Sequence, residues 1–255
     1  MHRLAIIGAG LLSIAALAGA ASGADLPART YNKAPAIAAP GTDWSGFYIG
    51  LNGGGASSHE CWTLTSNNGL AVVPNRDEGC HNATGGLIGG QIGYRWQAAN
   101  WVFGLEAQGD WASLTGSNPS LALTVIPVTN QTKIDAIGLF TGQVGYAWNN
   151  VLLYAKGGAA VVHNRFTGFF TATGFQVYDT SEVRWGGAVG TGIEFSFAPN
   201  WSVAIEYDHL FMGNPDVAWP ATNLAVSRND NIRQDVDMGT VRVNYRFGGP
   251  VVAKY

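Results

Sequence analysis

Two cysteines and two histidines form the most concentrated set of chemically active side chains in the sequence. Cys61 and Cys80 are the only cysteines among 255 residues, and His59 and His81 lie close to them in the chain. If the chain is exported, the cysteine pair is most simply a disulfide bond, because compartments outside the cytoplasm are oxidising. The alternative is a zinc site, since the four side chains offer suitable sulfur and nitrogen ligands. Their spacing matches no recognised zinc pattern, which favours the disulfide.

Two further histidines are candidate catalytic bases. His163 and His209 stand near the ends of apolar segments, and Asp208 is adjacent to the second. Catalysis of this kind needs a base beside a nucleophile, or a close pair of carboxylates. No recognised motif surrounds these residues, so solvated or interfacial histidines are the simpler interpretation. We expect no catalytic site, no cofactor and no bound metal.

A third set consists of charged residues that alternate with apolar ones. Successive strand side chains point to opposite faces, so these charges share a face and the apolar residues share the other. The two signs are balanced, which lets them pair inside a barrel. Eight strands leave an interior just wide enough for side chains, so we predict a packed lumen, with a narrow diffusion channel as the alternative. The predicted lumen residues are Arg95, Glu106, Asp110, Asp135, Lys156, Arg184, Glu194, Glu206, Arg242 and Arg246.

The segment 87–111 shows the elements that position these charges. Its two halves alternate with period two around a short turn, which predicts a β-hairpin. Trp96 and Trp101 flank that turn on the apolar face, and Trp148 and Trp201 flank two other short turns. Amphipathic indoles in such places are typical of the belt that a transmembrane barrel presents at the membrane interface. We therefore predict an aromatic girdle at Trp96, Trp101, Trp148 and Trp201.

The same pattern recurs along the chain. It predicts an all-β, eight-stranded antiparallel up-and-down transmembrane β-barrel over residues 44–247. Short turns alternate with four long loops, at about 57–84, 113–132, 164–181 and 213–233, as in outer-membrane barrels. A soluble ligand-binding barrel of the lipocalin kind, with its apolar face inward, is a less favoured alternative.

Composition and the amino-terminal segment support export to a membrane. Residues 1–24 read as a cleaved signal peptide, and residues 25–43 as a flexible, proline-containing segment. Charged residues make up 12% of the chain, about half the share of a typical soluble domain. The net charge of −3 and the absence of a basic cluster argue against nucleic acid as a partner.

Three stretches of sequence carry a family resemblance. Residues 43–54, DWSGFYIGLNGG, the leader ending ADLP at residues 24–27, and the last-strand motif VNYRF at 243–247 resemble small outer-membrane β-barrel proteins of alphaproteobacteria. These porin-family surface antigens are related in architecture to the OmpA transmembrane barrel. The resemblance implies a location in the outer membrane of a Gram-negative bacterium, in contact with lipid and lipopolysaccharide. It also implies a role in envelope structure and surface contact, with channel activity suggested for some members.

The chain departs from this pattern at its carboxyl end. Members commonly stop at the aromatic residue that ends the last strand, whereas here residues 248–255 follow. We expect this tail to be loose in the periplasm. The signal for the barrel-assembly machinery would then be internal, formed by Gly239, Val241, Val243, Tyr245 and Phe247. What the external loops bind is not predicted.

Overall fold

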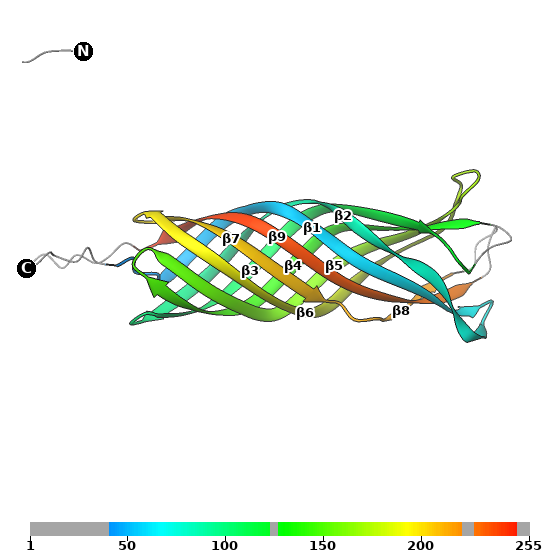
Figure 1. The fold of residues 1–255 in the computed structure, drawn as a ribbon, viewed down its shortest axis with the longest axis horizontal. Helices are drawn as coiled ribbons and strands as arrows, with labels where there is room; N and C mark the ends of the chain where they lie inside the picture. The colour runs from blue at the N-terminus through cyan, green and yellow to red at the C-terminus, as the bar shows by residue number, and fades with distance from the viewer. Residues whose placement is uncertain (1–40, 123–126, 221–226, 249–255) are drawn as a thin grey trace, which may run out of the picture. The chain divides into compact units, whose positions relative to one another are not determined.

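The computed structural model describes residues 41–122, 127–220 and 227–248. The expected signal peptide, most of the expected lead segment and most of the carboxyl-terminal tail lie outside these residues. Within them, nine β-strands form one antiparallel sheet (Figure 1). The strands are β1 (Gly46–Asn67), β2 (Leu70–Ala98), β3 (Trp101–Pro119), β4 (Val128–Trp148), β5 (Val151–Phe170), β6 (Gln176–Ala198), β7 (Trp201–Phe211), β8 (Asp216–Trp219) and β9 (Arg228–Phe247).

The sheet closes into a barrel because β1 pairs with both β2 and β9. Each other strand pairs with its neighbour in the chain, except that β7 and the short β8 both pair with β9, one beyond the other. The barrel therefore has eight positions around its wall, with β7 and β8 sharing one. The predicted all-β, up-and-down antiparallel barrel is confirmed.

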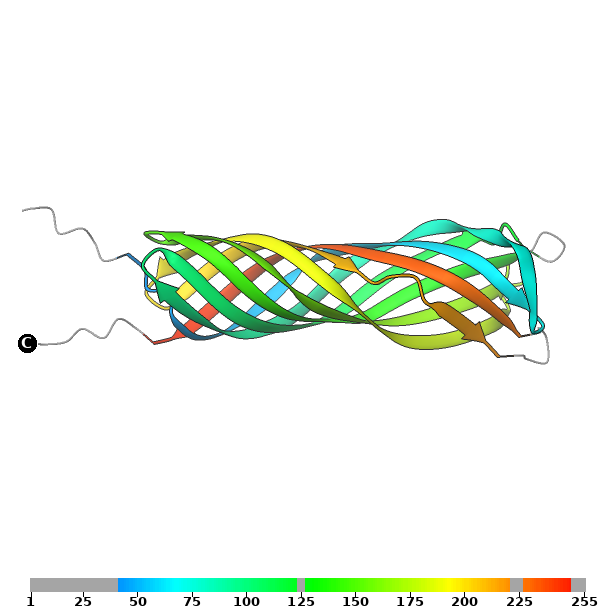
Figure 2. The ribbon, with the colours of Figure 1, turned by 90° about the horizontal axis from the view of Figure 1, so that it is seen from below.

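The strands are tilted against the barrel axis. Trp111 pairs with Ile88, and the ladder of paired residues can be followed from there once around the wall. It returns to β3 at Trp101 rather than at Trp111. Such an offset is the shear that accompanies strand tilt in closed barrels, and Figure 2 shows the strands crossing the axis obliquely.

The outward face carries an apolar band that ends in aromatic residues. At the end with the three short turns, Trp96, Trp101, Trp148 and Trp201 are each about half exposed. At the other end the band finishes at Trp111, Trp185 and Phe211, which are also exposed. The pattern is that of a wall facing hydrocarbon with interfacial aromatics at both edges. Among the described residues, no helix is long and apolar enough to cross a membrane.

The four predicted long loops are wrong, because the strands continue through most of them. β1 and β2 run on to a two-residue turn at Asn68 and Gly69, whose positive φ angles of 51° and 74° suit a tight hairpin turn. Beyond the apolar band both faces of a strand can be polar. The alternation that marks a membrane strand is therefore lost there, although the strand itself persists.

Beyond the band the wall divides into two facing sheets. The ladder between β2 and β3 ends at Thr84 and Thr115, and the ladder between β6 and β7 ends at Gly187 and Phe211. Strands β8, β9, β1 and β2 form one sheet, and β3 to β6 form the other; the two diverge at the right of Figure 1. An apolar cluster lies between them, formed by Trp62, Phe166, Val177, Tyr178, Val217, Trp219 and Ile232.

Candidate functional site

The lumen at the level of the apolar band is organised around buried tyrosines that lie over glycines. Tyr48 on β1 pairs in register with Gly93 on β2. A Cβ atom at Gly93 would lie only 2.5 Å from the Tyr48 hydroxyl, so a side chain there would displace the ring. The hydroxyl donates a 2.6 Å hydrogen bond to Glu106 of β3. Glycine thus lets Tyr48 lie flat against the wall and reach this carboxylate.

The opposite half of the barrel repeats this unit. Tyr154 on β5 lies over Gly192 on β6 and donates a 2.6 Å hydrogen bond to Glu206 on β7. Both glutamates stand five residues after a turn-flanking tryptophan, Glu106 after Trp101 and Glu206 after Trp201. The lumen therefore has an approximate internal repeat that brings two carboxylates together.

Two cations bridge these carboxylates across the lumen. The guanidinium of Arg242 donates to Glu106 at 2.6 Å and also to Glu206. The ammonium of Lys156 lies 2.6 Å from Glu206, 3.2 Å from Asp208 and 3.5 Å from Glu106. All five side chains are almost completely buried. The resulting network joins β3, β5, β7 and β9 through the middle of the barrel.

A second ion pair lies nearer the short turns. Arg95 of β2 donates a 2.8 Å hydrogen bond to Glu194 of β6, which also accepts from Ser202 and Asn244. The guanidinium carbon of Arg95 lies 4.4 Å from the ring centroid of Tyr48, within cation–π range. This layer thus ties the wall together below the central network.

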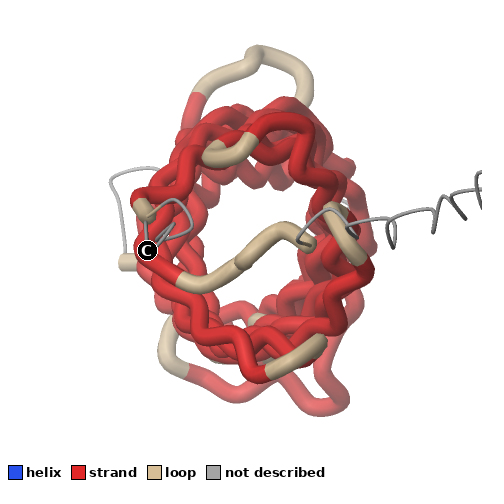
Figure 3. Tube along the Cα trace, turned by 90° about the vertical axis from the view of Figure 1, so that its left-hand side faces the viewer, coloured by secondary structure: helices blue, strands red, loops and turns tan. Residues whose placement is uncertain are grey.

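The segment before β1 crosses the barrel mouth at this end, as Figure 3 shows. The amide of Thr42 donates to the carbonyl of Asn149 in the β4–β5 turn at 3.0 Å. The amide of Trp44 donates to the side-chain oxygen of Gln97 on β2 at 2.7 Å. The segment is therefore held at both sides of the opening.

Trp44 fills this mouth of the barrel. Its side chain is completely buried and packs with Val102, Ala147, Leu152 and Tyr154. The guanidinium carbons of Arg95 and Arg246 lie 6.0 Å and 5.5 Å from its ring centroid. The indole closes the opening below the ion-pair layer.

The structure places the predicted lumen charges inside the wall, with one exception. Asp135 lies on the outer surface, where its carboxylate is 2.5 Å from Nδ1 of His163. The prediction for Asp135 is wrong because β4 has a bulge between Ile134 and Ala136, which reverses the inside and outside positions beyond it. The buried members are Arg95, Glu106, Asp110, Lys156, Arg184, Glu194, Glu206, Arg242 and Arg246.

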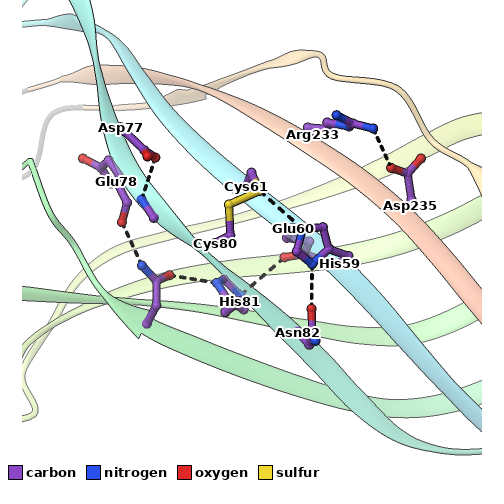
Figure 4. The surroundings of a disulfide bond; sticks show 12 residues. His59, Glu60, Cys61, Asp77, Glu78, Cys80, His81, Asn82, Arg233 and Asp235 are labelled. Atoms are coloured by element: carbon purple, nitrogen blue, oxygen red, sulfur yellow. Dashed lines mark hydrogen bonds and ion pairs between the residues drawn. A yellow bond between two sulfur atoms is a disulfide. The ribbon is translucent and has the colours of Figure 1, made fainter.

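Cys61 of β1 and Cys80 of β2 are paired in register and joined by a disulfide bond (Figure 4). Of the four side chains of the zinc alternative, His59, Cys61 and Cys80 have their ligand atoms within 4.8 Å of one another, but the two sulfurs are bonded to each other and His81 lies apart. His59 lies on the outer face, whereas His81 points inward, where Asn118 and Thr132 hydrogen-bond its ring nitrogens at 2.8 Å and 3.1 Å.

The two candidate catalytic histidines lie on the outer wall near the edge of the apolar band. His163 pairs with Asp135, and His209 pairs with Asp237 at 2.7 Å. Asp208, next to His209 in the chain, points into the lumen and binds Lys156. In the described residues neither imidazole is hydrogen-bonded to a serine, threonine or cysteine.

The arrangement nearest to a catalytic triad lies instead inside the outer half of the barrel. The ring of His81 is hydrogen-bonded to Asn118 on one side and to the hydroxyl of Thr132 on the other, and its Nε2 is 3.5 Å from the carboxylate of Glu60. Burial raises the pKa of Glu60 to about 7 and lowers the pKa of His81. Thr132 is completely buried, so no external carbonyl can reach its hydroxyl.

A charge cluster further from the apolar band links β9 to β2, the two strands that flank β1. Arg228 of β9 lies 2.6 Å from both Glu78 of β2 and Asp230 of β9, and all three are buried. One guanidinium thus serves two carboxylates. Burial, reinforced by the neighbouring charge of Glu78, raises the pKa of Asp230 to about 7 although Arg228 opposes the shift.

Several residues that build the lumen were not predicted as a site. Tyr48, Tyr154 and Asp208 fall on the polar face of their strands, and the repeated spacing from tryptophan to glutamate in β3 and β7 is a signal that points to their partners. Glu60, Glu78, Arg228 and Asp230 fall in segments expected to be loops. No alternation signal marks those segments.

Comparison with known proteins agrees with this architecture. The family model described as "Outer membrane protein beta-barrel domain" matches residues 9–247. The 31 kDa outer-membrane immunogenic proteins of Brucella melitensis biotype 1 and Brucella suis biovar 1 are each 29% identical to this chain over 249 residues, which is 93% of this chain and 98% of the relative.

Solved structures show the same fold at much lower sequence identity. The outer membrane protease OmpT from Escherichia coli superposes with a TM-score of 0.53 and 9% identity, over 79% of this chain and 97% of that chain. A likeness at this identity concerns the fold alone. The match of the family model to most of the sequence places the protein in the outer membrane. The chain belongs to the outer membrane protein β-barrel family.

Proposed function

We propose that the protein is a closed outer-membrane barrel with a structural and surface-interaction role, not a diffusion channel. One observation carries the proposal: Arg242, Glu106, Glu206 and Lys156 meet in the middle of the lumen and are buried there. Ions would have to pass between side chains already bonded to each other. Separating buried, paired charges costs several kcal/mol, which makes spontaneous opening rare.

Trp44 supports the same proposal from the periplasmic side. It closes the mouth below the network, so a solute faces two barriers in series. The β-sheets that project beyond the apolar band offer the surface for contact with partners. β1 and β2 show how far these sheets extend: the two strands continue past the disulfide to their connecting turn at Asn68 and Gly69.

Planar lipid bilayer recordings on the refolded protein test the proposal. We expect no reproducible conductance steps at high salt, while an open porin recorded in the same bilayers gives them. Heat-dependent mobility on a detergent gel checks that the barrel is folded in each preparation. Reproducible open steps from the folded form would replace the structural role with the channel alternative.

The proposal includes the absence of catalysis, although a protease shares the fold. His163 and His209 pair with carboxylates on the outer wall, and the buried Thr132 has no access to a substrate. Incubation with peptide and ester libraries tests this part. Turnover that disappears in a His163→Gln or a His209→Gln variant would overturn it.

We also propose how the protein meets its membrane partners. Gly239, Val241, Val243, Tyr245 and Phe247 share the outward face of β9, as a signal read by the assembly machinery requires. The outer edge of the wall would contact lipopolysaccharide. Replacing Phe247 with Ser should slow insertion in an in vitro assembly assay, whereas Thr240→Ser, which changes an inward residue, should not.

A further inference from the structure

We propose that the Cys61–Cys80 disulfide is a site of thiol–disulfide exchange with thiols outside the cell. Cys80 receives the incoming thiolate, and Cys61 departs as a thiolate beside His59. The inference goes beyond the proposed structural role, because it assigns a reaction to a bond that would otherwise only hold two strands together.

The bond is accessible to a dissolved thiol. Both cysteines lie on the outer face of the wall beyond the apolar band, with Cys80 exposed and Cys61 half-buried. Attack on a disulfide proceeds at one sulfur and expels the other. Because Cys80 is the more exposed residue, we expect a thiolate to reach its sulfur first.

The surroundings of Cys61 favour its departure. Nε2 of His59 lies 3.5 Å from the Cys61 sulfur, and Nδ1 of the same ring is 2.7 Å from the side-chain oxygen of Asn82 (Figure 4). The side-chain oxygen of Asn82 accepts a hydrogen bond from Nδ1–H, which leaves Nε2 facing the sulfur. A protonated His59 can then donate to the thiolate, which lowers the barrier to its release.

The charges around the two sulfurs are unequal. Arg233 of β9 is the in-register partner of Cys61 and is 71% exposed, although Asp235, 3.4 Å from its guanidinium, offsets part of its charge. Asp77 lies on the Cys80 side, where its carboxylate accepts from the amide of Gly79 at 2.9 Å. Together with the His59 contact, this arrangement favours a thiolate at Cys61 over one at Cys80.

The exchange balances without any further oxidant. An external thiolate forms a bond to the Cys80 sulfur, and the bond between Cys80 and Cys61 breaks with its electron pair passing to Cys61. The products are a mixed disulfide at Cys80 and a Cys61 thiolate that takes a hydrogen bond from His59. The total number of thiol and disulfide groups is unchanged.

Glutathione is the probe that tests the site on the folded, full-length protein. After brief exposure at neutral pH, free thiols are alkylated and the peptides are assigned by mass spectrometry. We expect glutathione on Cys80 and the alkyl group on Cys61. Glutathione found mainly on Cys61 would overturn the assignment of the two roles.

Rates measured on variants test the part played by His59. Because the leaving thiolate loses its donor, His59→Gln should slow the exchange by roughly fivefold. Asn82→Ala should slow it less, and His163→Gln, which changes a half-buried histidine elsewhere on the outer wall, should leave it unchanged. An unaltered rate in His59→Gln contradicts the proposal.

A neutral thiol separates release of Cys61 from simple attraction of a charged reagent. With 2-mercaptoethanol the His59→Gln variant should show the same slowing as with glutathione. Slowing restricted to the anionic glutathione would mean that His59 only attracts negative thiols, which overturns its role at the leaving sulfur. Unchanged heat-dependent gel mobility shows that each variant is folded.

Discussion

Arg242 and Glu106 form a 2.6 Å ion pair although β1 and β2 lie between their strands in the wall. The two side chains meet through the lumen, not along the sheet. Their contact therefore cross-braces the barrel and closes it at the same time.

Removing this brace should destabilise the folded barrel. Arg242→Gln leaves Glu106 and Glu206 with only Lys156 as a cation, and breaking a buried ion pair costs about 3 to 5 kcal/mol. We expect a loss of that order in the free energy of unfolding, measured by urea titration in lipid vesicles. The control Arg165→Gln changes a half-exposed arginine 3.9 Å from Asp179 and should cost less than about 1 kcal/mol. Equal losses in the two variants would contradict a bracing role for Arg242.

If Trp44 and the charge network each block the lumen, removing one of them should not be enough to let ions through. Trp44→Ala should open only the periplasmic mouth, because the charge network above it is intact. Replacing Glu106, Lys156, Glu206 and Arg242 together with Ala should likewise conduct little while Trp44 remains. Only the combination should give steps in planar bilayers, and these should be small, because a cluster of buried apolar side chains that includes Leu114, Leu139 and Leu210 also fills part of the interior.

Two results would disagree with barriers in series. Current from Trp44→Ala alone would show that the network does not obstruct ions. Silence from a folded combined variant would show that another part of the lumen closes it. Gel mobility before and after heating identifies the preparations in which the barrel has formed.

Much of the membrane-embedded fold follows from the sequence, because lipid imposes a simple rule there. Outward residues must be apolar and inward residues polar, so alternation locates the strands, and tryptophans locate one edge of the band. Beyond the band water contacts the outer face, and the rule no longer applies. The outer halves of β1 and β2 therefore carry no pattern that separates them from a loop.

Local exceptions within the band escape the same reasoning. The bulge at Asp135 inserts one residue and reverses inside and outside, which parity counting cannot detect. No sequence pattern marks Trp44 as buried, because its burial depends on the chain before β1 crossing the mouth. Which charges pair across the lumen depends on the register between strands, and this register is known only once the pairing around the closed barrel is known.

The disulfide should stabilise one region rather than the whole barrel. Beyond Thr84 toward the hairpin tip, β2 pairs with β1 but has no ladder to β3. Apart from the Glu78 carbonyl, which accepts from Leu121 and Asn118, the Cys61–Cys80 bond supplements the β1 ladder alone. Closing a loop of this length is worth about 3 kcal/mol in the chain-entropy model. In the double variant Cys61→Ser with Cys80→Ser, we expect faster hydrogen exchange in residues 70–79.

The membrane part of the same strand is the internal control for that measurement. Residues 87–95 are paired on both sides, to β1 and β3, and their exchange should not change. Faster exchange throughout β2 would show that the disulfide supports the entire barrel. No change in residues 70–79 would show that the β1 ladder alone holds the hairpin.

Asp230 should make the outer sheet sensitive to pH. It shares Arg228 with Glu78, is completely buried, and has a pKa raised from 3.8 to about 7. The folded protein thus binds a proton that the unfolded chain releases near pH 4. The stabilisation linked to this proton is present under acidic conditions and is lost as the pH rises through about 7.

Hydrogen exchange of residues 228–234, corrected for the intrinsic effect of pH, measures this loss. Protection should be greater at pH 5 than at pH 8.5, because the ionised Asp230 lies beside the Glu78 carboxylate with one arginine for both. Asp230→Asn keeps an acceptor for Arg228 but cannot ionise, so its protection should vary little with pH. Asp235→Asn, which changes a carboxylate on the outer face beside Arg233, should behave like the unmodified protein. The same pH dependence in Asp230→Asn would assign the titration to another group.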